Sequence, residues 1–306
     1  MRILSYVLLL ISLTACSAVD FADKQNEKEL YKSNFSQQQL QLENNGKLNY
    51  WIAGQGEPVL LIHGFAAGAS ASWKDMMLEL SKDHQVIAPD LFWFGESDSD
   101  SKANLLTQTL AIQALIEHLQ LDELHVVGIS FGGFVAFDLM VQEPKVKTTT
   151  LIASPAITFS DDHIESMTKR LEVTDLSETF VPQNAQQMRH LLELSFNDFP
   201  WLPNFIDDDI YQRHFASHLD EKIQLIETLP NDRERVINAT DIDQLPPTLL
   251  IWGSNDRIFP LSSGLELADK LETSIVVIDN GPHALSNEHP EIISQSIRAF
   301  IERNND

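Results

Sequence analysis

The chain has a single cysteine, Cys16, among its 306 residues, which excludes an internal disulfide framework and a cysteine-rich zinc site. Basic residues are also scarce, because 21 Lys plus Arg stand against 45 Asp plus Glu and the formal net charge is −24. Such a molecule repels polyanions, which argues against nucleic acid as a partner and against electrostatic docking on anionic lipid. What the sequence does have is 43% hydrophobic residues, ample for the core of one large domain or two small ones.

The apolar run at the N-terminus, from Ile3 to Leu13, is too short to span a bilayer. It follows Arg2 and ends in the small residues Thr14 and Ala15, which is the pattern of a cleaved export signal. Since Cys16 comes next, the segment also resembles the bacterial lipobox, whose cysteine carries lipid and becomes the first mature residue. The alternative is an ordinary secretory signal with an incidental cysteine.

The lipobox resemblance implies a signal peptide over residues 1–15 and a covalent lipid anchor on Cys16. Two or more acyl chains hold a protein on a membrane essentially permanently, so no transmembrane helix is needed. Residues 16–37 are polar and show no convincing period, which predicts a tether. Ser17 is not the aspartate that bacterial lipoproteins associate with inner-membrane retention, so the resemblance points to the outer membrane of a bacterial cell envelope.

From residue 38 the pattern changes to alternating apolar and polar positions on either side of Asn45-Gly46. Asn-Gly between two such runs predicts an antiparallel hairpin, because both central turn positions favour a positive φ. We therefore expect the folded domain to open with an antiparallel hairpin.

The remaining chain alternates short runs that are apolar on both faces with longer amphipathic runs. Runs of the first kind are typical of central parallel strands covered by helices on both sides. Their alternation with helical runs predicts an α/β fold with right-handed crossovers. The apolar runs are 58–62, 85–88, 124–127, 149–153, 248–252 and 274–278, and the amphipathic runs are 73–80, 105–119, 134–141, 261–271 and 290–301.

One interval, residues 157–240, breaks this alternation and shows no clear strand signal. It is rich in helix formers and large apolar residues, which predicts an inserted helical cap. For any one of these apolar side chains the core of the cap is the commoner place. Taken together they must leave a cleft over the site below, and such clefts are mostly apolar.

A Gly-x-Ser-x-Gly motif, residues 128–132, follows directly on the apolar run 124–127 and leads into a helical pattern. In that context the motif predicts a nucleophile elbow, a strained strand-to-helix turn that exposes the Ser130 hydroxyl at a helix N-terminus. The N–H groups there favour developing negative charge. The alternative is a glycine-rich turn without chemistry.

From about residue 38 to its C-terminus the chain resembles the α/β-hydrolase family, and the family's signatures appear in the expected order. They are the oxyanion turn His63-Gly64-Phe65, the turn of Asp90, Gly95 and Ser97 in which Phe92-Trp93 replaces the usual Pro-Gly, the acid loop 251–260, and the histidine loop Gly281-Pro282-His283. Residues 182–196 together with Ile251-Trp252-Gly253 look like bacterial lipases of the monoacylglycerol-lipase branch.

The resemblance implies an α/β-hydrolase fold with a mostly parallel central sheet, an antiparallel N-terminal hairpin and helices on both faces. The core would comprise residues 38–156 and 241–306, with the helical cap at 157–240 inserted between them.

Three residues take the chemical roles in this resemblance. Ser130 would attack an acyl carbonyl, His283 would accept its proton and later protonate the leaving alcohol, and Asp256 would orient the imidazole. The resemblance places the oxyanion donors at the backbone N–H groups of Phe65 and Phe131. No metal or organic cofactor is implied.

Other histidines compete with His283. His289 lies beside Pro290 at a predicted helix start and lacks a preceding strand and glycine, so we expect a surface histidine. His63 lies within the oxyanion turn and is expected to make structural hydrogen bonds rather than to transfer protons.

Other carboxylates compete with Asp256. A family variant carries the acid after the sixth strand, but Ser154-Pro155 stands there, which leaves Asp256. Asp90 is expected to cap its turn. The run Asp207-Asp208-Asp209 is expected to be a solvated turn, because calcium needs better ligand geometry than three consecutive side chains provide.

The sequence thus predicts a membrane-tethered serine hydrolase that cleaves carboxylic esters of small or lipid-like acyl groups, a lipase or esterase. Peptidase, acyltransferase and carbon–carbon hydrolase activities use the same three residues and stay open. A lipoprotein that binds an apolar ligand without catalysis is the alternative from another class.

Overall fold

The computed structural model describes residues 19–65 and 68–305, and its centre is one eight-stranded sheet. The strand order is β1-β2-β4-β3-β5-β6-β7-β8, with β1 and β2 antiparallel and β3 to β8 parallel to one another. The predicted α/β-hydrolase fold is confirmed. The strands are β1 (Ser36–Gln41), β2 (Lys47–Ala53), β3 (Pro58–Ile62), β4 (Gln85–Pro89), β5 (Leu124–Ile129), β6 (Val146–Ile152), β7 (Thr248–Gly253) and β8 (Ser274–Ile278).

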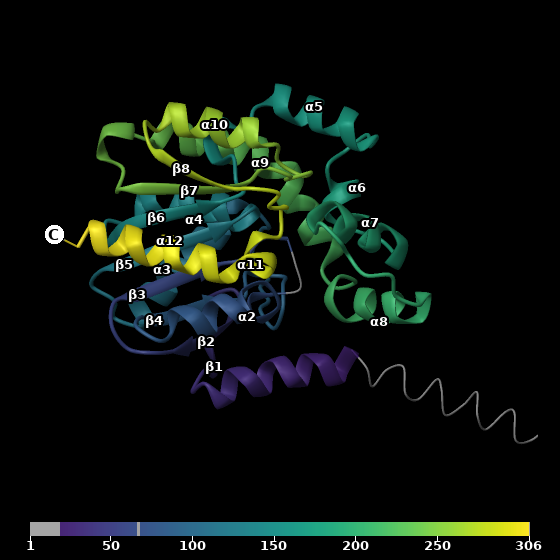
Figure 1. Ribbon diagram of the computed structural model, residues 1–306, viewed down its shortest axis with the longest axis horizontal. Coiled ribbons are helices and arrows are strands. Elements are labelled where there is room, and N and C mark those ends of the chain that lie inside the picture. Colours follow the sequence, from purple (N-terminus) through teal and green to yellow (C-terminus); the bar gives the residue numbers. More distant parts are fainter. Residues whose placement is uncertain (1–18, 66–67, 306) are drawn as a thin grey trace, which may run out of the picture.

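Helices cover both faces of the sheet, and the strands supply apolar side chains to each (Figure 1). In β3, Val59 and Leu61 join the apolar cluster under α2 and α12, whereas Leu60 and Ile62 join the cluster under α3, α4 and α10. This double burial explains why the central strands are apolar throughout. The covering helices are α2 (Ala69–Leu80), α3 (Leu105–His118), α4 (Phe131–Gln142), α10 (Leu261–Lys270), the short α11 (Leu285–Glu288) and α12 (Pro290–Arg303).

The turn between β1 and β2 lies one residue earlier than the sequence predicts. Asn44 and Asn45 hold the two central positions, with φ of 52° and 54°, and Gly46 follows them. The Gly46 N–H donates to the Glu43 carbonyl at 2.9 Å, which closes the turn. Gly46 is needed there for space, since a Cβ would lie 2.9 Å from the Glu43 carbonyl oxygen. Asparagine tolerates the left-handed region well enough to take both central positions.

Between β6 and β7 the chain forms five α-helices, of which α6, α7 and α8 lie beyond one end of the sheet (Figure 1). They occupy the segment in which the sequence predicts a helical cap. These helices are α5 (Asp161–Leu171), α6 (Ser177–Phe180), α7 (Ala185–Ser195), α8 (Asn204–His214) and α9 (Leu219–Ala239).

The run Asp207-Asp208-Asp209 is helical and lies within α8, so the prediction of a solvated turn is wrong. Asp207 is buried, and both of its carboxylate oxygens accept hydrogen bonds of 2.7 Å from the Arg189 guanidinium on α7. Asp209 pairs with Arg213 one turn along the same helix. The acidic run therefore joins α7 to α8.

Most of the segment predicted to be a tether, residues 16–37, is folded. Residues 19–32 form a helix and β1 begins at Ser36. Leu30 and Phe35 are buried in the same apolar cluster as Trp51 and Trp73. The segment shows no sequence period because its apolar side chains do not share one environment: Val19, Leu30 and Phe35 are buried, whereas Phe21 and Tyr31 are exposed. Within the described residues, no helix is both long and apolar enough to cross a bilayer.

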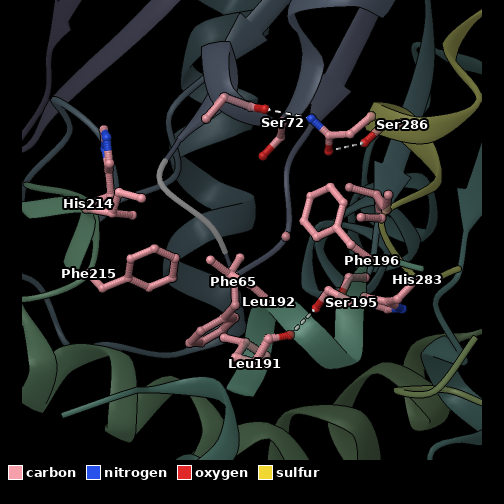
Figure 2. A pocket seen from close by; sticks show the side chains of 17 residues that line it. Phe65, Ser72, Leu191, Leu192, Ser195, Phe196, His214, Phe215, His283 and Ser286 are labelled. Carbon is pink, nitrogen blue, oxygen red and sulfur yellow. Dashed lines mark hydrogen bonds between the residues drawn. The ribbon is translucent and has the colours of Figure 1, made fainter. Parts of the chain in front are cut away.

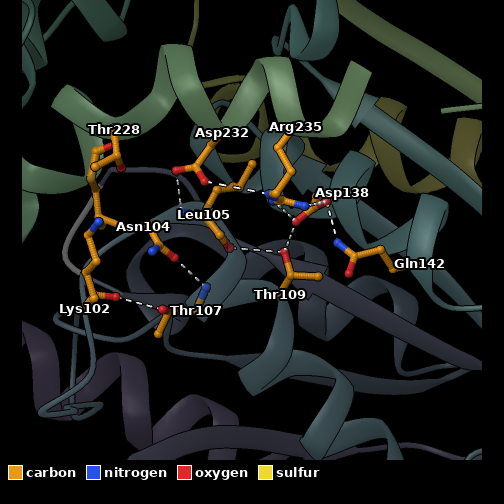
Figure 3. A network of polar contacts seen from close by, with 11 residues as sticks. Lys102, Asn104, Leu105, Thr107, Thr109, Asp138, Gln142, Thr228, Asp232 and Arg235 are labelled. Carbon is orange, nitrogen blue, oxygen red and sulfur yellow. Dashed lines mark hydrogen bonds and ion pairs between the residues drawn. The ribbon is translucent and has the colours of Figure 1, made fainter. Parts of the chain in front are cut away.

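A buried ion pair fastens the cap to the core (Figure 3). Asp138 on α4 is fully buried, and its carboxylate accepts hydrogen bonds from the Arg235 guanidinium on α9 at 3.0 and 2.8 Å. Thr109 and Gln142 donate to the same carboxylate. One turn earlier on α9, Asp232 accepts from the backbone N–H of Leu105 at the start of α3. The charge of Asp138 is therefore satisfied only when α9 is in place.

Arg235→Leu is expected to destabilise the protein by ~3 kcal/mol, because it leaves the Asp138 carboxylate buried beside hydroxyl and amide donors alone. This is the low end for a broken buried pair, since the Arg235 side chain is partly exposed. Urea unfolding followed by circular dichroism measures the change. Lys169→Leu is the matched control, since Lys169 pairs with Glu165 on the exposed face of α5, and its effect should be much smaller. Equal effects of the two substitutions would contradict the interpretation of this ion pair.

Candidate active site

Ser130 sits on a sharp turn between β5 and α4, with φ of 53° and ψ of −122°. Its neighbours in the motif are glycines because other backbone lies against them. A Cβ on Gly132 would lie 2.1 Å from the Ile62 carbonyl oxygen, and one on Gly128 would lie 2.3 Å from the Gly132 carbonyl oxygen. The close approach of these segments holds Ser130 at a positive φ, in the left-handed region where residues other than glycine are rarely found.

The Ser130 hydroxyl begins a chain of hydrogen bonds. Its Oγ lies 2.9 Å from Nε2 of His283, and Nδ1 of the same ring lies 2.9 Å from Oδ2 of Asp256. The other carboxylate oxygen, Oδ1, accepts from the backbone N–H groups of Ile258 and Phe259, both at 2.8 Å. The Asp256 carboxylate is fully buried, so the backbone fixes its orientation and leaves Oδ2 for the imidazole.

The three residues come from loops at the carboxyl ends of β5, β7 and β8. The last two loops are bonded to each other, since Ser254 N–H donates to the Ile278 carbonyl and Asn255 N–H donates to the Gly281 carbonyl. The carboxyl edge of a parallel sheet is the usual place for a site in open α/β folds. The structure thus brings together the serine, histidine and aspartate singled out in the sequence.

The predicted oxyanion turn packs directly against Ser130. A Cβ on Gly64 would lie 2.9 Å from the Ser130 Cβ, so only glycine allows this approach. The ring of Phe65 meets that of Phe131 edge to face, with centroids 4.9 Å apart. The two backbone positions predicted as oxyanion donors therefore flank the serine.

His63 holds this turn in place. Its Nε2 accepts from the Leu91 N–H at 2.9 Å, so the proton lies on Nδ1, which donates to the Gly64 carbonyl at 2.7 Å. The ring is fully buried, and burial lowers the pKa of His63, which favours the neutral form that these two bonds require. His63 makes structural hydrogen bonds, as expected.

Two other residues weighed in the sequence, Asp90 and His289, lie outside the hydrogen-bond chain of Ser130. Asp90 accepts from the Ala69 N–H at 2.7 Å, from the Glu96 N–H at 3.1 Å and from the Asn49 amide at 2.8 Å, which ties its turn to α2 and β2. In the same turn Trp93 replaces the usual glycine, has φ of 69° and is fully buried. His289 precedes α12, and its Nε2 has no partner within the described part of the chain.

A cap lysine lies against the oxyanion turn. Lys222 on α9 is buried, with its ammonium 5.0 Å from the centre of the Phe94 ring. That ring contacts both His63 and Phe65. Burial lowers the pKa of Lys222 to about 8. The position of α9 is thus coupled to that of the oxyanion turn.

Two cavities reach Ser130. The larger, of about 220 Å³, lies between the core loops and helices α7 and α8 (Figure 2), and the smaller, of about 30 Å³, lies under α6 and α9. Sequence reasoning predicted an apolar cleft under the cap but did not single out the wall from α8, because the apolar residues of that helix are spaced among charged ones. The larger cavity is lined by Gly64, Phe65, Ala71, Ser72, Ile129, Ser130, Leu191, Leu192, Ser195, Phe196, Ile210, His214, Phe215, His283, Ala284, Ser286 and Asn287.

The family model for the alpha/beta hydrolase fold matches residues 57–290. The chain belongs to this family. A 2-hydroxymuconate semialdehyde hydrolase from Pseudomonas sp. (strain CF600) is 29% identical over 271 residues, which cover 83% of this chain and 90% of that protein.

Solved structures show the same fold. A membrane phospholipase A described as a bacterial virulence factor superposes with a TM-score of 0.78 at 24% identity, covering 100% of this chain and 99% of that one. A meta-cleavage product hydrolase from Pseudomonas fluorescens IP01 gives a TM-score of 0.69 at 25% identity, covering 88% of this chain and 98% of that one. The whole described fold therefore has a counterpart among solved structures.

Asp256→Asn is expected to slow the reaction of Ser130 with a fluorophosphonate by roughly 10³–10⁴-fold, since the analogous change in a serine protease costs about 10⁴. The amide oxygen must stay on the two backbone N–H groups, which turns the NH₂ group toward His283. Nδ1 must then accept, the ring proton moves to Nε2, and Nε2 can no longer accept from the serine.

Labelling followed by intact-protein mass spectrometry measures this rate. Asp279→Asn, which removes an exposed carboxylate in the loop after β8, is the control and should label at the normal rate. Normal labelling of Asp256→Asn would contradict the proposed tautomer.

Proposed function

We propose that this hydrolase is a serine carboxylic-ester hydrolase, a lipase or esterase that works through an acyl-enzyme. The observation that supports it is the continuous hydrogen-bond chain from Ser130 through His283 to Asp256 at the mouth of two apolar cavities. A ligand-binding protein has no use for a serine aligned with a base that is itself aligned by a buried carboxylate.

The reaction follows from this arrangement. Nε2 of His283 takes the proton as the Ser130 oxygen attacks the ester carbonyl, and the Asp256 carboxylate stabilises the imidazolium that forms. The backbone N–H groups of Phe65 and Phe131 would receive the oxyanion, each worth ~3 kcal/mol of the barrier in comparable enzymes. The imidazolium then protonates the leaving alcohol, and a water activated by the same ring releases the acid.

The relatives support carbon–carbon bond hydrolysis as a second candidate. One of them, 26% identical over 239 residues, is a 2-hydroxy-6-oxo-2,4-heptadienoate hydrolase, whose substrate by that name carries a carboxylate. A carboxylate buried in an apolar site needs a cationic partner. Among the described residues, neither cavity is lined by a lysine or an arginine, and this favours neutral esters.

Ser130→Ala is expected to reduce the hydrolysis of p-nitrophenyl esters by at least ~10⁴-fold without loss of the fold, since removal of the nucleophile from a comparable triad costs about 10⁶. Release of p-nitrophenol measures the activity and circular dichroism checks the fold. Ser296→Ala, on the exposed side of α12, is the control. Unchanged turnover in Ser130→Ala would refute the assignment, and an unaltered protein that no fluorophosphonate labels would favour a non-catalytic binder.

We also propose that the enzyme is lipid-anchored through Cys16 to the bacterial cell envelope, at the outer membrane. Cys16 and the signal peptide 1–15 lie outside the described residues, and the proposal comes from their sequence. Among the described residues, those nearest to Cys16 form the helix over 19–32, which is docked on the protein, so an anchor at Cys16 would hold the folded domain close to the membrane. Two carboxylates of this helix pair with side chains of α8. Asp20 Oδ1 lies 3.5 Å from Nη1 of Arg213, and Asp23 Oδ2 lies 3.3 Å from Nε2 of His214.

Mass spectrometry of the mature protein from a bacterial membrane fraction tests the anchor. We expect an N-terminal peptide that begins at Cys16 and carries the mass of acyl chains, and we expect Cys16→Ser to abolish it. An unmodified N-terminus released into the medium would show an ordinary secretory signal instead.

A further inference from the structure

The two cavities meet at Ser130 and, among the residues that the structure describes, share one other lining residue, Phe65. An ester bound for attack has its carbonyl carbon at the serine, with the acyl group on one side and the alcohol on the other. The two cavities are therefore the two places where the halves of the substrate can lie.

The position of His283 decides which half lies where. The leaving alcohol must come within hydrogen-bond reach of Nε2, because that atom protonates it. His283 lines the larger cavity and not the smaller one. On the other side, Phe259 lines the smaller cavity and packs edge to face on the imidazole, with ring centroids 5.6 Å apart. The ring is thus covered on that side, and the alcohol belongs in the larger cavity.

The two volumes differ enough to select substrates. A dry cavity of about 150 Å³ accepts benzene, whereas about 10–15 Å³ is the least that holds one water molecule. By that measure the smaller cavity, at about 30 Å³, has room for a methyl or ethyl group. The larger cavity, at about 220 Å³, has room for an aromatic ring or a medium-length chain.

Both cavities are apolar, but the smaller one is walled by rigid side chains. From the core it is lined by the aromatic rings of Phe131, Phe134 and Phe259, and from the start of the cap by that of Phe159. Helix α6 of the cap adds Phe180, whose ring lies 6.5 Å from that of Phe65. Apart from the shared Ser130 and Phe65, the remaining lining residues are aliphatic side chains of the cap, namely Ile164, Leu176, Ile226, Leu229 and Pro230. The aromatic part of this close-packed wall does not expand for additional methylene groups without strain.

We propose that the enzyme prefers esters of a short acid, acetate or propionate, with a large apolar alcohol, and that Phe180 sets the upper limit on the acyl chain. This inference rests on the ester hydrolase function proposed above. It narrows the substrate class that the sequence leaves open between small and lipid-like acyl groups.

Two substrate series test the assignment of the cavities. The first keeps p-nitrophenol and lengthens the acid from acetate through butanoate to octanoate. The second keeps acetate and lengthens the alcohol from methanol through butanol to octanol, with acid release followed by titration at constant pH. We expect kcat/KM to fall by at least ~10-fold along the first series, since one methylene in a tight pocket already costs about 10–200-fold. Along the second series kcat/KM should rise.

Phe180→Ala should then raise the octanoate-to-acetate ratio of kcat/KM by at least ~10-fold, because it removes a ring from the wall that limits the acyl chain. Ile226→Ala, on α9 in the same wall, is a second variant for the case that Phe180→Ala does not fold. Leu192→Ala, in the wall of the larger cavity, is the matched control: it should weaken the preference for long alcohols and leave the acyl ratio unchanged.

A preference for octanoate in the unaltered enzyme would overturn the inference, and so would equal changes of the acyl ratio in Phe180→Ala and Leu192→Ala. Both results would leave the ester hydrolase function standing. If no ester of either series is hydrolysed and Ser130 is not labelled by a fluorophosphonate, the function itself fails.

Discussion

The left-handed backbone of Ser130 is the constraint on which the rest of the site depends. It exists because β3, β5 and the start of α4 approach one another so closely at Gly64, Gly128 and Gly132 that no side chain fits between them. A strained residue persists only where its surroundings over-determine it, and here three segments of backbone do so. The hydroxyl is thereby presented at the carboxyl edge of the sheet.

Main-chain atoms also fix the side chains around the serine. Backbone N–H groups orient Asp256, which orients His283, and His63 joins the oxyanion turn to the loop at Leu91. Most of these partners are main-chain atoms of neighbouring loops, so the geometry follows from the fold more than from any one side chain. This is the preorganisation that makes such a site effective before a substrate arrives.

Much of the fold was predictable because its signals are local. The double-sided apolar runs locate the central strands, β3 to the residue, and the Gly-x-Ser-x-Gly motif marks the turn at Ser130. The chain order of Ser130, Asp256 and His283 was readable once the family was recognised. What the sequence could not supply is the mutual placement of loops that are more than a hundred residues apart.

The predictions that were wrong, and the features that were missed, also depend on contacts between distant parts of the chain. The turn at Asn44-Asn45 differs from the expected one because two asparagines compete with glycine for positive φ. The acidic run in α8 is helical because Arg189, eighteen residues earlier, neutralises Asp207. The pair of Asp138 and Arg235 was not singled out at all, since neither residue stands out from its surroundings in the sequence. Each of these features depends on a partner that only tertiary structure provides.

The helix over residues 19–32 is part of the folded domain and not of a linker. Leu30 and the adjoining Phe35 share an apolar cluster with Trp51 and Trp73. Asp20 and Asp23 of the same helix pair with residues at the end of α8, which is also a wall of the larger cavity. A chain shortened to residue 38 would lose the apolar contacts of Leu30 and Phe35 and the ion pairs to α8. The loss would reach the substrate, because α8 would be held less firmly where it lines the larger cavity.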